Sequence, residues 1–235
     1  MTAVVTGAAG GIGAALAERL AAEHDHVILA DVDGERLEAV AGRLGATAIE
    51  VDVADASAWD AIVAAAGTPD LLCLNAGVLS SELGPPWAAG PDEWQRVLAV
   101  NVGGVVNGLR AFVPRLLERD EPAAILVTAS LAGVLTWPGG GPYAASKHAV
   151  LAVAEQAALA LADTPITVTA LCPALVRTGM SDVGADPGDV ADRALAAVAE
   201  GRFAVVDPEW APAIHARADA LAGGGPVEVP LPGTG

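Results

Sequence analysis

The strongest constraint on the fold is a glycine-rich turn that lies between an apolar run and an alanine-rich segment near the start of the chain. The run is typical of a buried strand, the turn reads T-G-A-A-G-G-I-G, and the segment after it has a helical composition; they occupy residues 3–5, 6–13 and 14–22. This order brings backbone N–H groups to a phosphate at the N-terminus of a helix, where the helix dipole also favours an anion. We expect Gly7 to permit the tight turn, Gly11 the close approach of a pyrophosphate and Gly13 the packing of helix on strand. The alternative is a glycine turn that binds no ligand.

Apolar and helical segments alternate along the rest of the chain. Strand-like runs occupy residues 27–30, 47–51, 70–74, 123–128, 166–171 and 203–206. Helical patterns occupy residues 33–43, 57–66, 91–117 with an interruption near 103–104, 143–161, a short stretch from 189, and 208–222, with a loop over 131–142. This alternation predicts an α/β fold, one doubly wound Rossmann sheet of seven parallel strands with helices on both faces. We expect a single domain over residues 1–222 and a poorly ordered Gly/Pro-rich tail over 223–235.

Composition excludes several classes of function. The formal net charge of −17 and the lack of a basic stripe argue against a nucleic acid or an anionic membrane as partner, because phosphate binding needs a concentrated basic surface. Cys73 and Cys172 are far apart in apolar surroundings, so we expect buried free thiols in a reducing compartment. No residues have the spacing of a metal site. The chain opens almost directly into a strand and no apolar run reaches the length of a membrane span, so we expect a soluble cytoplasmic protein.

Acidic residues follow the second and third expected strands, at the edge where doubly wound sheets bind ligands. Asp31 comes about 20 residues after the glycine turn, where a carboxylate would accept hydrogen bonds from the ribose hydroxyls of an adenosine. It would also repel a 2′-phosphate, and no arginine follows it immediately, so NAD is favoured over NADP. Asp33 is predicted to cap the next helix, with assistance to Asp31 as the alternative. Asp52 is either a ligand contact or a cap for the helix over 57–66, and the sequence leaves both open.

Two asparagines are expected near the same edge. Asn75, Ala76 and Gly77 close the fourth expected strand, and small residues there would let the backbone pass close to a bound cofactor. Asn101 lies among valines in the long helical pattern, and a buried asparagine needs hydrogen-bond partners. It either bonds to a distorted helix turn or carries a water towards Lys147.

Tyr143 is the only tyrosine and Lys147 the only lysine in a chain that has eleven arginines. On a helix, positions i and i+4 lie on one face, so the ammonium can sit beside the phenol. A positive charge there would lower the pKa of the phenol from about 10 towards the working range of a general acid or base. The planar fork of arginine would not fit where the compact ammonium does. The alternative is an accidental pair on a solvated helix face.

Together these motifs resemble those of the short-chain dehydrogenase/reductase family, over residues 3 to about 207. The matches are TGxxxGxG at 6–13, NAG at 75–77, Asn101, Ser130, YxxxK at 143–147 and PGxVxT at 173–178. Two positions depart from the family pattern. Ala174 replaces the glycine of the last motif, and Leu74 stands where many members have a second asparagine.

The resemblance implies an oxidoreductase that transfers hydride between a nicotinamide and a carbinol carbon. Tyr143 would exchange a proton with the substrate oxygen, and Ser130 would stabilise charge on that oxygen. Lys147 would lower the pKa of the phenol and hold the nicotinamide ribose, and Asn101 would support a water that leads from Lys147 to solvent. From the residues alone, Ser130 could instead be a strand-end turn residue.

The resemblance also implies a cofactor set beyond the glycine turn. Thr178 would bind the nicotinamide carboxamide, and Asp52 with Val53 would meet the adenine. Ile12, Pro173 and Val176 belong to the same set. From the residues alone, Thr178 could instead cap a helix.

The substrate side is predicted to be open and apolar, because the segment that usually forms a lid in the family is short here, residues 179–187. Candidate lining residues are Val78, Leu131, Leu135, Trp137 and Met180, which suit a hydrophobic secondary alcohol or ketone. Arg177 remains open as a partner for an anionic substrate group.

The helix over 143–161 is apolar on nearly all sides, which predicts burial on both faces and a homodimer or homotetramer. Residues 207–210 replace the family's usual glycine-rich ending, which puts the tetramer contact in doubt. Two other functions stay open: an NADP-dependent carbonyl reductase, and a non-catalytic dinucleotide-binding sensor or interaction protein.

Overall fold

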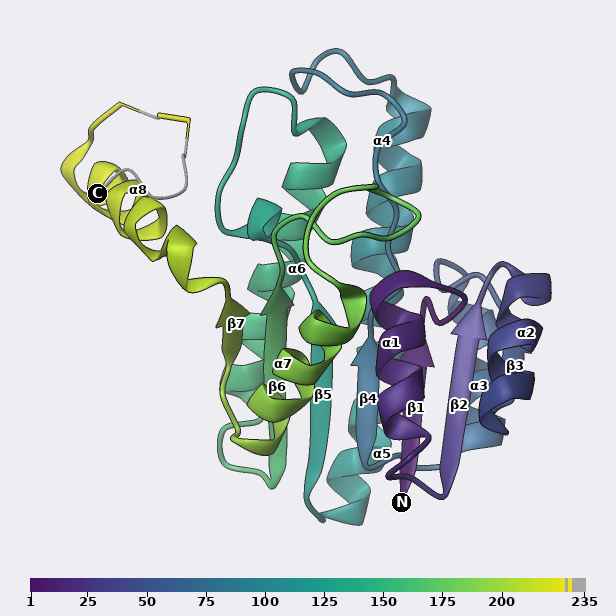
Figure 1. Ribbon diagram of the computed structural model, residues 1–235. Helices are drawn as coiled ribbons and strands as arrows, with labels where there is room; N and C mark the ends of the chain where they lie inside the picture. The colour runs from purple at the N-terminus through teal and green to yellow at the C-terminus, as the bar shows by residue number, and fades with distance from the viewer. Residues whose placement is uncertain (227, 230–235) are drawn as a thin grey trace.

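In the part of the chain that the computed structural model describes, residues 1–226 and 228–229, seven parallel strands form one sheet in the order β3-β2-β1-β4-β5-β6-β7 (Figure 1). The strands are β1 (Thr2–Thr6), β2 (His26–Asp31), β3 (Thr47–Glu50), β4 (Leu71–Leu74), β5 (Ala123–Thr128), β6 (Ile166–Cys172) and β7 (Ala204–Val206). Strands of a parallel sheet are covered on both faces and are therefore continuously apolar, as β4 is throughout. The predicted class, a doubly wound Rossmann fold in a single domain, is confirmed.

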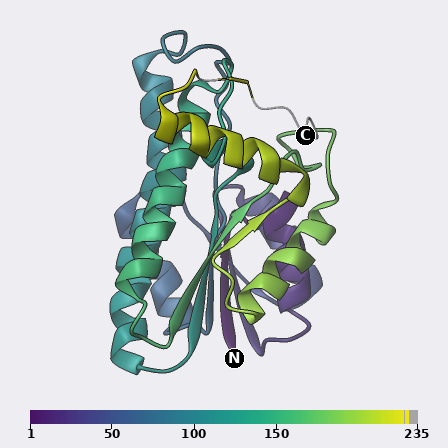
Figure 2. The same ribbon diagram turned by 90° about the vertical axis from the view of Figure 1, so that its left-hand side faces the viewer.

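Helices cover both faces of the sheet and give three layers (Figure 1, Figure 2). One face carries α1 (Gly11–Leu20), α2 (Gly34–Leu44) and α7 (Pro187–Ala199), and the other carries α3 (Trp59–Ala66), α5 (Gly104–Arg119) and α6 (Gly141–Ala160). Each face has its own apolar core. The first includes Leu16, Leu37 and Val190, and the second includes Trp59, Phe112 and Val150.

The strand order places a crossing point between β1 and β4, because the chain runs outward from β1 to β3 and then continues on the other side of β1. Loops that leave the carboxyl ends of these two strands diverge, and the crevice between them is where open α/β sheets bind ligands. The glycine turn follows β1 and residues 75–77 follow β4. Both predicted cofactor segments therefore lie at this point.

A long helix runs over residues 91–119 and consists of α4 (Pro91–Leu98), a π-helical turn η2 (Ala99–Gly103) and α5. The interruption expected near 103–104 is therefore a widened turn around Asn101, and such turns are frequent at functional positions. By length and composition this helix could cross a membrane, so the expectation that no apolar run reaches that length is wrong. A core helix passes the same test, and Val105, Phe112 and Leu116 of this helix pack in the core.

Several boundaries differ from the prediction. The expected loop over 131–142 contains the 3-10 helix η3 (Leu131–Gly133), which begins where the Ser130 hydroxyl accepts a hydrogen bond from Ala132 N. The helix expected to be short is α7, with 13 residues, and it starts at Pro187 behind the capping side chain of Asp186. The last helix is divided into η4 (Pro208–Trp210) and α8 (Ala211–Gly223).

Two helices are more exposed than their composition predicts. Burial of α6 on both faces is not found within one chain, since Ala144, Val150 and Ala154 are buried but Leu159 is 78% exposed. A partner subunit on the open face stays a prediction. No residue of α8 is buried, and the helix projects from the β7 edge of the sheet (Figure 1). Of the tail over 223–235, residues 227 and 230–235 lie outside the described residues.

Candidate active site

The glycine turn has the geometry that its three glycines predict. Gly7 and Gly11 have φ values of +68° and +56°, a left-handed conformation that side chains with a Cβ rarely adopt. A Cβ at Gly7 would lie 2.8 Å from Ala76 Cα, and a Cβ at Gly13 would overlap the carbonyl oxygen of Gly7. The first turn of α1 can therefore pack directly on the end of β1.

A hydrogen-bond network joins the carboxyl ends of β1, β4 and β5. The Thr6 hydroxyl accepts from the backbone N–H groups of Asn75 and Ala76 at 3.0 and 3.1 Å. Asn75 Nδ2 donates to Thr6 O at 3.1 Å, and the Thr128 hydroxyl donates to Asn75 Oδ1 at 3.0 Å. These bonds fix the three strand ends that surround the crossing point.

A cavity of about 810 Å³ runs along these strand ends and brings most of the predicted residues together. Its lining includes Gly7, Gly11, Ile12, Asp31, Asn75, Ala76, Gly77, Ser130, Leu131, Leu135, Trp137, Tyr143, Lys147, Pro173, Val176, Thr178 and Met180. Five predicted residues do not line it: Gly13, Val78 and Asn101, which support its walls, and Asp52 and Val53. Its volume is in the upper part of the range for small-molecule sites.

Asp31 lies in the cavity and also holds the glycine turn. Its two carboxylate oxygens accept from the backbone N–H groups of Ala9 and Asp33 at 2.9 and 3.0 Å. Asp33 caps α2 as predicted, by accepting from Arg36 N. The guanidinium of Arg36 lies beside Gly10 and also lines the cavity. Two carboxylates and one guanidinium therefore share the end of β2.

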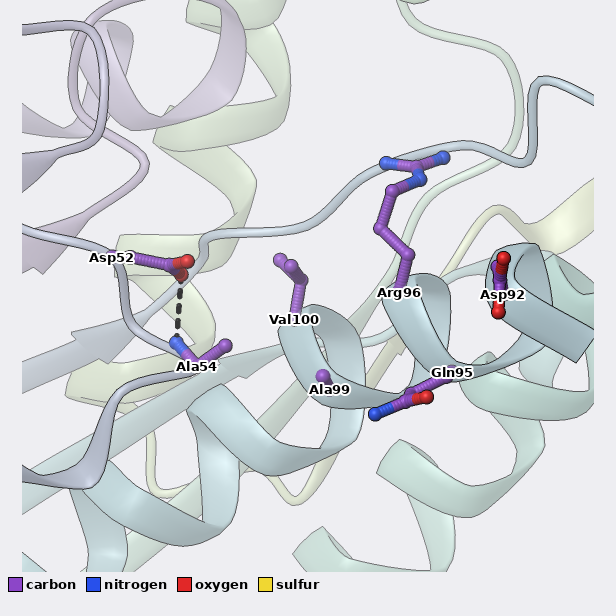
Figure 3. A pocket seen from close by; sticks show the side chains of 7 residues that line it. All are labelled: Asp52, Ala54, Asp92, Gln95, Arg96, Ala99 and Val100. Atoms are coloured by element: carbon purple, nitrogen blue, oxygen red, sulfur yellow. Dashed lines mark hydrogen bonds between the residues drawn. The ribbon is translucent and has the colours of Figure 1, made fainter.

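Asp52 and Val53 lie away from the main cavity. Asp52 lines a separate, shallower hollow of about 380 Å³ beside α4, and its carboxylate accepts from Ala54 N at 2.9 Å (Figure 3). The cap of the following 3-10 helix, η1 (Ala56–Ala58), is Asp55. Val53 is buried, and its carbonyl accepts from Trp59 Nε1 at 3.0 Å. Asp55 therefore makes the cap that was one interpretation of Asp52, and the contact of Asp52 and Val53 with an adenine stays a prediction.

Tyr143, Lys147 and Ser130 converge from α6 and from the loop after β5. Lys147 is only 4% exposed, and its Nζ donates to Thr128 O at 2.9 Å. The same nitrogen lies 5.9 Å from the centroid of the Tyr143 ring. Ser130 is buried at the end of β5. The helical spacing predicted for the phenol and the ammonium is therefore confirmed.

The pKa of Tyr143 does not follow the prediction. Burial raises the pKa of the phenol, and a hydrogen bond with the Ser130 hydroxyl acts in the opposite direction. Burial also lowers the pKa of Lys147 to about 8. The expected lowering of the phenol pKa by Lys147 is not found, because the ammonium is directed to the Thr128 carbonyl and desolvation of the phenol is the larger effect.

Asn101 sits in the π-helical turn and is almost fully buried. Its Oδ1 accepts from Val78 N at 2.7 Å, and its Nδ2 donates to Val78 O at 3.0 Å and to Ser146 Oγ at 2.9 Å. Ser146 Oγ in turn donates to Tyr143 O at 2.7 Å. The side chain thus joins the loop after β4 to the helix of Tyr143, rather than bonding to its own distorted turn.

The segment after β6 folds over the glycine turn. The Thr178 methyl lies 2.9 Å from the point where a Cβ of Gly11 would be, and the Thr178 hydroxyl accepts from Met180 N at 3.1 Å. Thr178 therefore caps no helix. The guanidinium of Arg177 donates to Gly184 O and Asp186 at 3.1 and 3.0 Å. Arg177 is thus engaged in its own loop and does not line the cavity.

The lining residues that reasoning from the sequence missed include Arg36, Leu79, Leu83 and Trp210. Arg36 could have been predicted from the sequence, because it lies in the first turn of the helix that follows β2. Leu79 and Leu83 lie in a loop without periodicity, and Trp210 belongs to η4 at the far end of the chain. No local pattern distinguishes these three residues.

This arrangement defines a class of protein, the Rossmann-fold enzymes that act on a hydroxyl or carbonyl group beside a dinucleotide. Comparison with known families gives the particular family. The family described as short chain dehydrogenase matches residues 1–186, and the chain belongs to it.

Relatives of this chain are named as dehydrogenases, which are oxidoreductases. The 1-deoxy-11-beta-hydroxypentalenate dehydrogenase of Streptomyces exfoliatus is 42% identical over 187 residues, which cover 76% of this chain and 68% of the relative. The 2-(R)-hydroxypropyl-CoM dehydrogenase of Xanthobacter autotrophicus is 34% identical over 209 residues, which cover 83% and 82% of the two chains. A short chain dehydrogenase/reductase from Burkholderia phymatum in complex with NAD has a TM-score of 0.91 and 30% identity, and the match covers 98% of this chain and 97% of that chain. The names of the two relatives specify different hydroxyl compounds.

Proposed function

We propose that the protein is an NAD-dependent dehydrogenase or reductase that interconverts a hydrophobic secondary alcohol and its ketone, with Tyr143 as general acid and base. The observation that carries the proposal is that Tyr143, Ser130 and Lys147 line the same cavity as the glycine turn. A protein that only bound a dinucleotide would not require the Tyr143 phenol to lie beside the Ser130 hydroxyl and the Lys147 ammonium. The membership of the family supports the same reaction class.

The glycine turn fits a dinucleotide. A Cβ at Gly7 would clash with Ala76, and a Cβ at Gly11 would clash with the Thr178 side chain. With glycines there, the backbone at the N-terminus of α1 is open to a pyrophosphate. NAD held at this point would accept a hydride in oxidation and supply one in reduction.

The side chains of the protein would do the acid–base work. The Ser130 hydroxyl would hold the substrate oxygen and stabilise the charge that develops there. The Tyr143 hydroxyl would take the proton of an alcohol or give a proton to a ketone. Because burial raises the pKa of Tyr143, oxidation should be favoured at alkaline pH, where more of the phenol is ionised.

The choice of NAD over NADP rests on the end of β2. Asp31 and Asp33 line the cavity there, and two carboxylates would repel a 2′-phosphate. Arg36 favours the second candidate, an NADP enzyme, because a guanidinium can bind that phosphate. Arg36 Nη1 also lies 3.7 Å from Asp33 Oδ2, and this carboxylate offsets part of the charge of the guanidinium.

The lining of the substrate side suits an apolar molecule. Leu131, Leu135 and Met180 face the cavity together with Trp137. Arg177 is paired with Asp186 and would not bind a substrate anion. We therefore propose a secondary alcohol or ketone whose carbon skeleton is hydrophobic.

Replacing the proposed acid–base group tests this function. Tyr143→Phe should lower kcat for the best of a panel of secondary alcohols by about 10³, because the proton would have no acceptor. NADH absorbance measures turnover, and calorimetry should show an NAD Kd within about twofold of the parent. If the phenylalanine variant oxidises alcohols at the parent rate, the mechanism is wrong.

The parent protein distinguishes the enzyme from the sensor. A sensor would bind NAD but convert no alcohol or ketone in the panel, in either direction. An enzyme should show turnover that the Tyr143→Phe variant loses.

A further inference from the structure

One wall of the cavity is a loop without regular secondary structure. Residues 75–90 connect β4 to α4, and Leu79 and Leu83 of this loop line the cavity. The loop extends across to the wall on the far side, where Gly84 N donates to Gly139 O at 3.4 Å. A segment of this kind would normally be mobile, so what holds it in place determines the shape of the cavity.

A buried carboxylate of α4 holds the middle of this loop. Glu93 is 8% exposed, and its Oε1 accepts from the backbone N–H of Ser81 at 2.6 Å and from the Ser81 hydroxyl at 3.1 Å. Arg96, one helical turn later, donates to both carboxylate oxygens at 2.9 Å. The same guanidinium donates to Leu79 O at 2.8 Å. Glu93 and Arg96 thus hold the loop at residues 79 and 81.

The ends of the loop are also attached to the long helix. Asn101 binds both backbone groups of Val78, as described above. Glu82 accepts from Gly90 N at 2.7 Å, and Trp94 Nε1 donates to Pro86 O at 3.1 Å. Arg96 also lines the shallow hollow near Asp52 (Figure 3), but its guanidinium donates to Glu93 and to Leu79 O. The loop is therefore anchored to the long helix at several points, and Glu93 is the buried carboxylate among them.

We propose that Glu93 and Arg96 are positioning residues that hold Leu79 and Leu83 against the substrate and so select for the size of its apolar part. This inference rests on the proposed function, since it assigns a substrate to the same cavity. Neither Glu93 nor Arg96 lines the main cavity, so we expect both to act through the loop and not by contact with the reacting atoms.

The physical argument is one of desolvation. A carboxylate removed from water is stable only where hydrogen bonds and an opposite charge replace its hydration. Four hydrogen bonds do this for Glu93, and the Arg96 guanidinium holds its pKa well below the usual range. Because the bonds are lost if residues 79–81 move, the same requirement keeps Leu79 in one position. Leu83 follows two residues after Ser81 and is 75% exposed, so the attachment limits its position through the backbone.

Two variants weaken the attachment at different points. Glu93→Gln keeps the shape but removes the charge that pairs with Arg96, and Ser81→Ala removes one bond at an exposed position that the fold tolerates. Glu118→Gln on the exposed part of α5 is the matched control. The substrates are cyclododecanol and 2-butanol, which differ in the apolar surface they offer to the wall.

Selectivity is the main measurement. In Glu93→Gln the ratio of kcat/KM for cyclododecanol to that for 2-butanol should fall about tenfold, chiefly through KM, and in Ser81→Ala about threefold. The control should keep the parent ratio, and the NAD Kd should be unchanged in every variant. An unchanged ratio overturns the proposal, and so does an equal loss for both alcohols with weaker NAD binding, which would indicate only a damaged fold.

Two readouts work without turnover. Amide hydrogen exchange over residues 79–90 should be faster in both variants than in the control, and cyclododecanone should bind more weakly to the NADH complex by calorimetry. Parent-like exchange and binding in Glu93→Gln overturn the inference even if no alcohol is oxidised. If the parent shows no turnover but hydrogen exchange and cyclododecanone binding change as expected, the proposed function is overturned. The role of Glu93 and Arg96 in holding the loop is then still supported.

Discussion

At the scale of single residues, Lys147 is a residue of the proposed site whose burial lowers the stability of the folded protein. It is the only lysine in a chain that has eleven arginines, and it is almost completely buried. Burial disfavours the charged form and lowers the pKa from 10.5 to about 8. The ammonium donates one hydrogen bond, to Thr128 O, which does not replace the hydration that it loses on burial. The buried charge therefore lowers the stability of the fold.

Replacing Lys147 with methionine should therefore stabilise the protein while abolishing turnover. The unfolded chain binds the proton up to about pH 10.5 and the folded chain only up to about pH 8. The ammonium thus destabilises the fold fully below pH 8, and this effect fades as pH rises through the window from 8 to 10.5. We expect Lys147→Met to be more stable by about 1–3 kcal/mol at pH 7, after the loss of the Thr128 bond.

Urea denaturation of both proteins at pH 7 and pH 10 measures this difference. The advantage of the methionine variant should shrink at pH 10. A variant that is less stable at pH 7, or whose advantage grows with pH, would contradict the burial argument.

At the scale of elements, the glycine turn decides how closely α1 approaches the sheet. Gly13 faces the Gly7 carbonyl at a separation that leaves no room for a Cβ. The α1 helix and the end of β1 therefore form one packed unit, and the open floor of the cavity depends on it. In the π-helical turn of the long helix, Asn101 bonds to Val78 and Ser146 and so joins two further elements of the site.

A methyl group at Gly13 should force α1 away from β1. Gly13→Ala is expected to lower the free energy of unfolding by about 3 kcal/mol, because overpacking displaces backbone rather than a flexible side chain. Gly42→Ala is the control, since Gly42 is helical, exposed and has no atom within 4 Å of its Cβ position. It should raise stability by about 0.5–1 kcal/mol. Equal effects in the two variants, measured by urea denaturation, would show that packing of α1 does not depend on Gly13.

At the scale of the whole molecule, charge and cofactor choice are linked. The chain carries a net charge of −17, and Asp31 and Asp33 add to that field at the end of β2. Only Arg36 opposes it within the cavity lining near β2. A cofactor with fewer negative charges should therefore bind more tightly.

NAD should raise the Tm of the protein more than NADP at the same concentration. At about 100 times its Kd a ligand stabilises the folded state by about 2.7 kcal/mol, which for a chain of this size is a shift of about 5–10 °C. Thermal unfolding with each cofactor at equal ionic strength measures the difference. A larger shift with NADP would show that Arg36 outweighs the two carboxylates.

Much of this protein could be predicted from local sequence alone. The alternation of apolar and helical segments determined the seven-stranded sheet, and the glycine spacing determined the turn after β1, because both depend on covalent geometry and short-range sterics. The pairing of Tyr143 with Lys147 follows in the same way from the helical repeat. Family resemblance added Ser130 and Thr178, which lie in the cavity as expected.

Only the tertiary structure decided which distant segments share the cavity and how deeply each group is buried. It placed Asp52 beside a separate hollow, brought Leu79, Leu83 and Trp210 to the cavity, and paired Arg177 with Asp186. It also reversed the expected direction of the pKa shift of Tyr143. The physical reason is that desolvation and packing depend on neighbours brought together from across the chain, and no local pattern of residues records those neighbours.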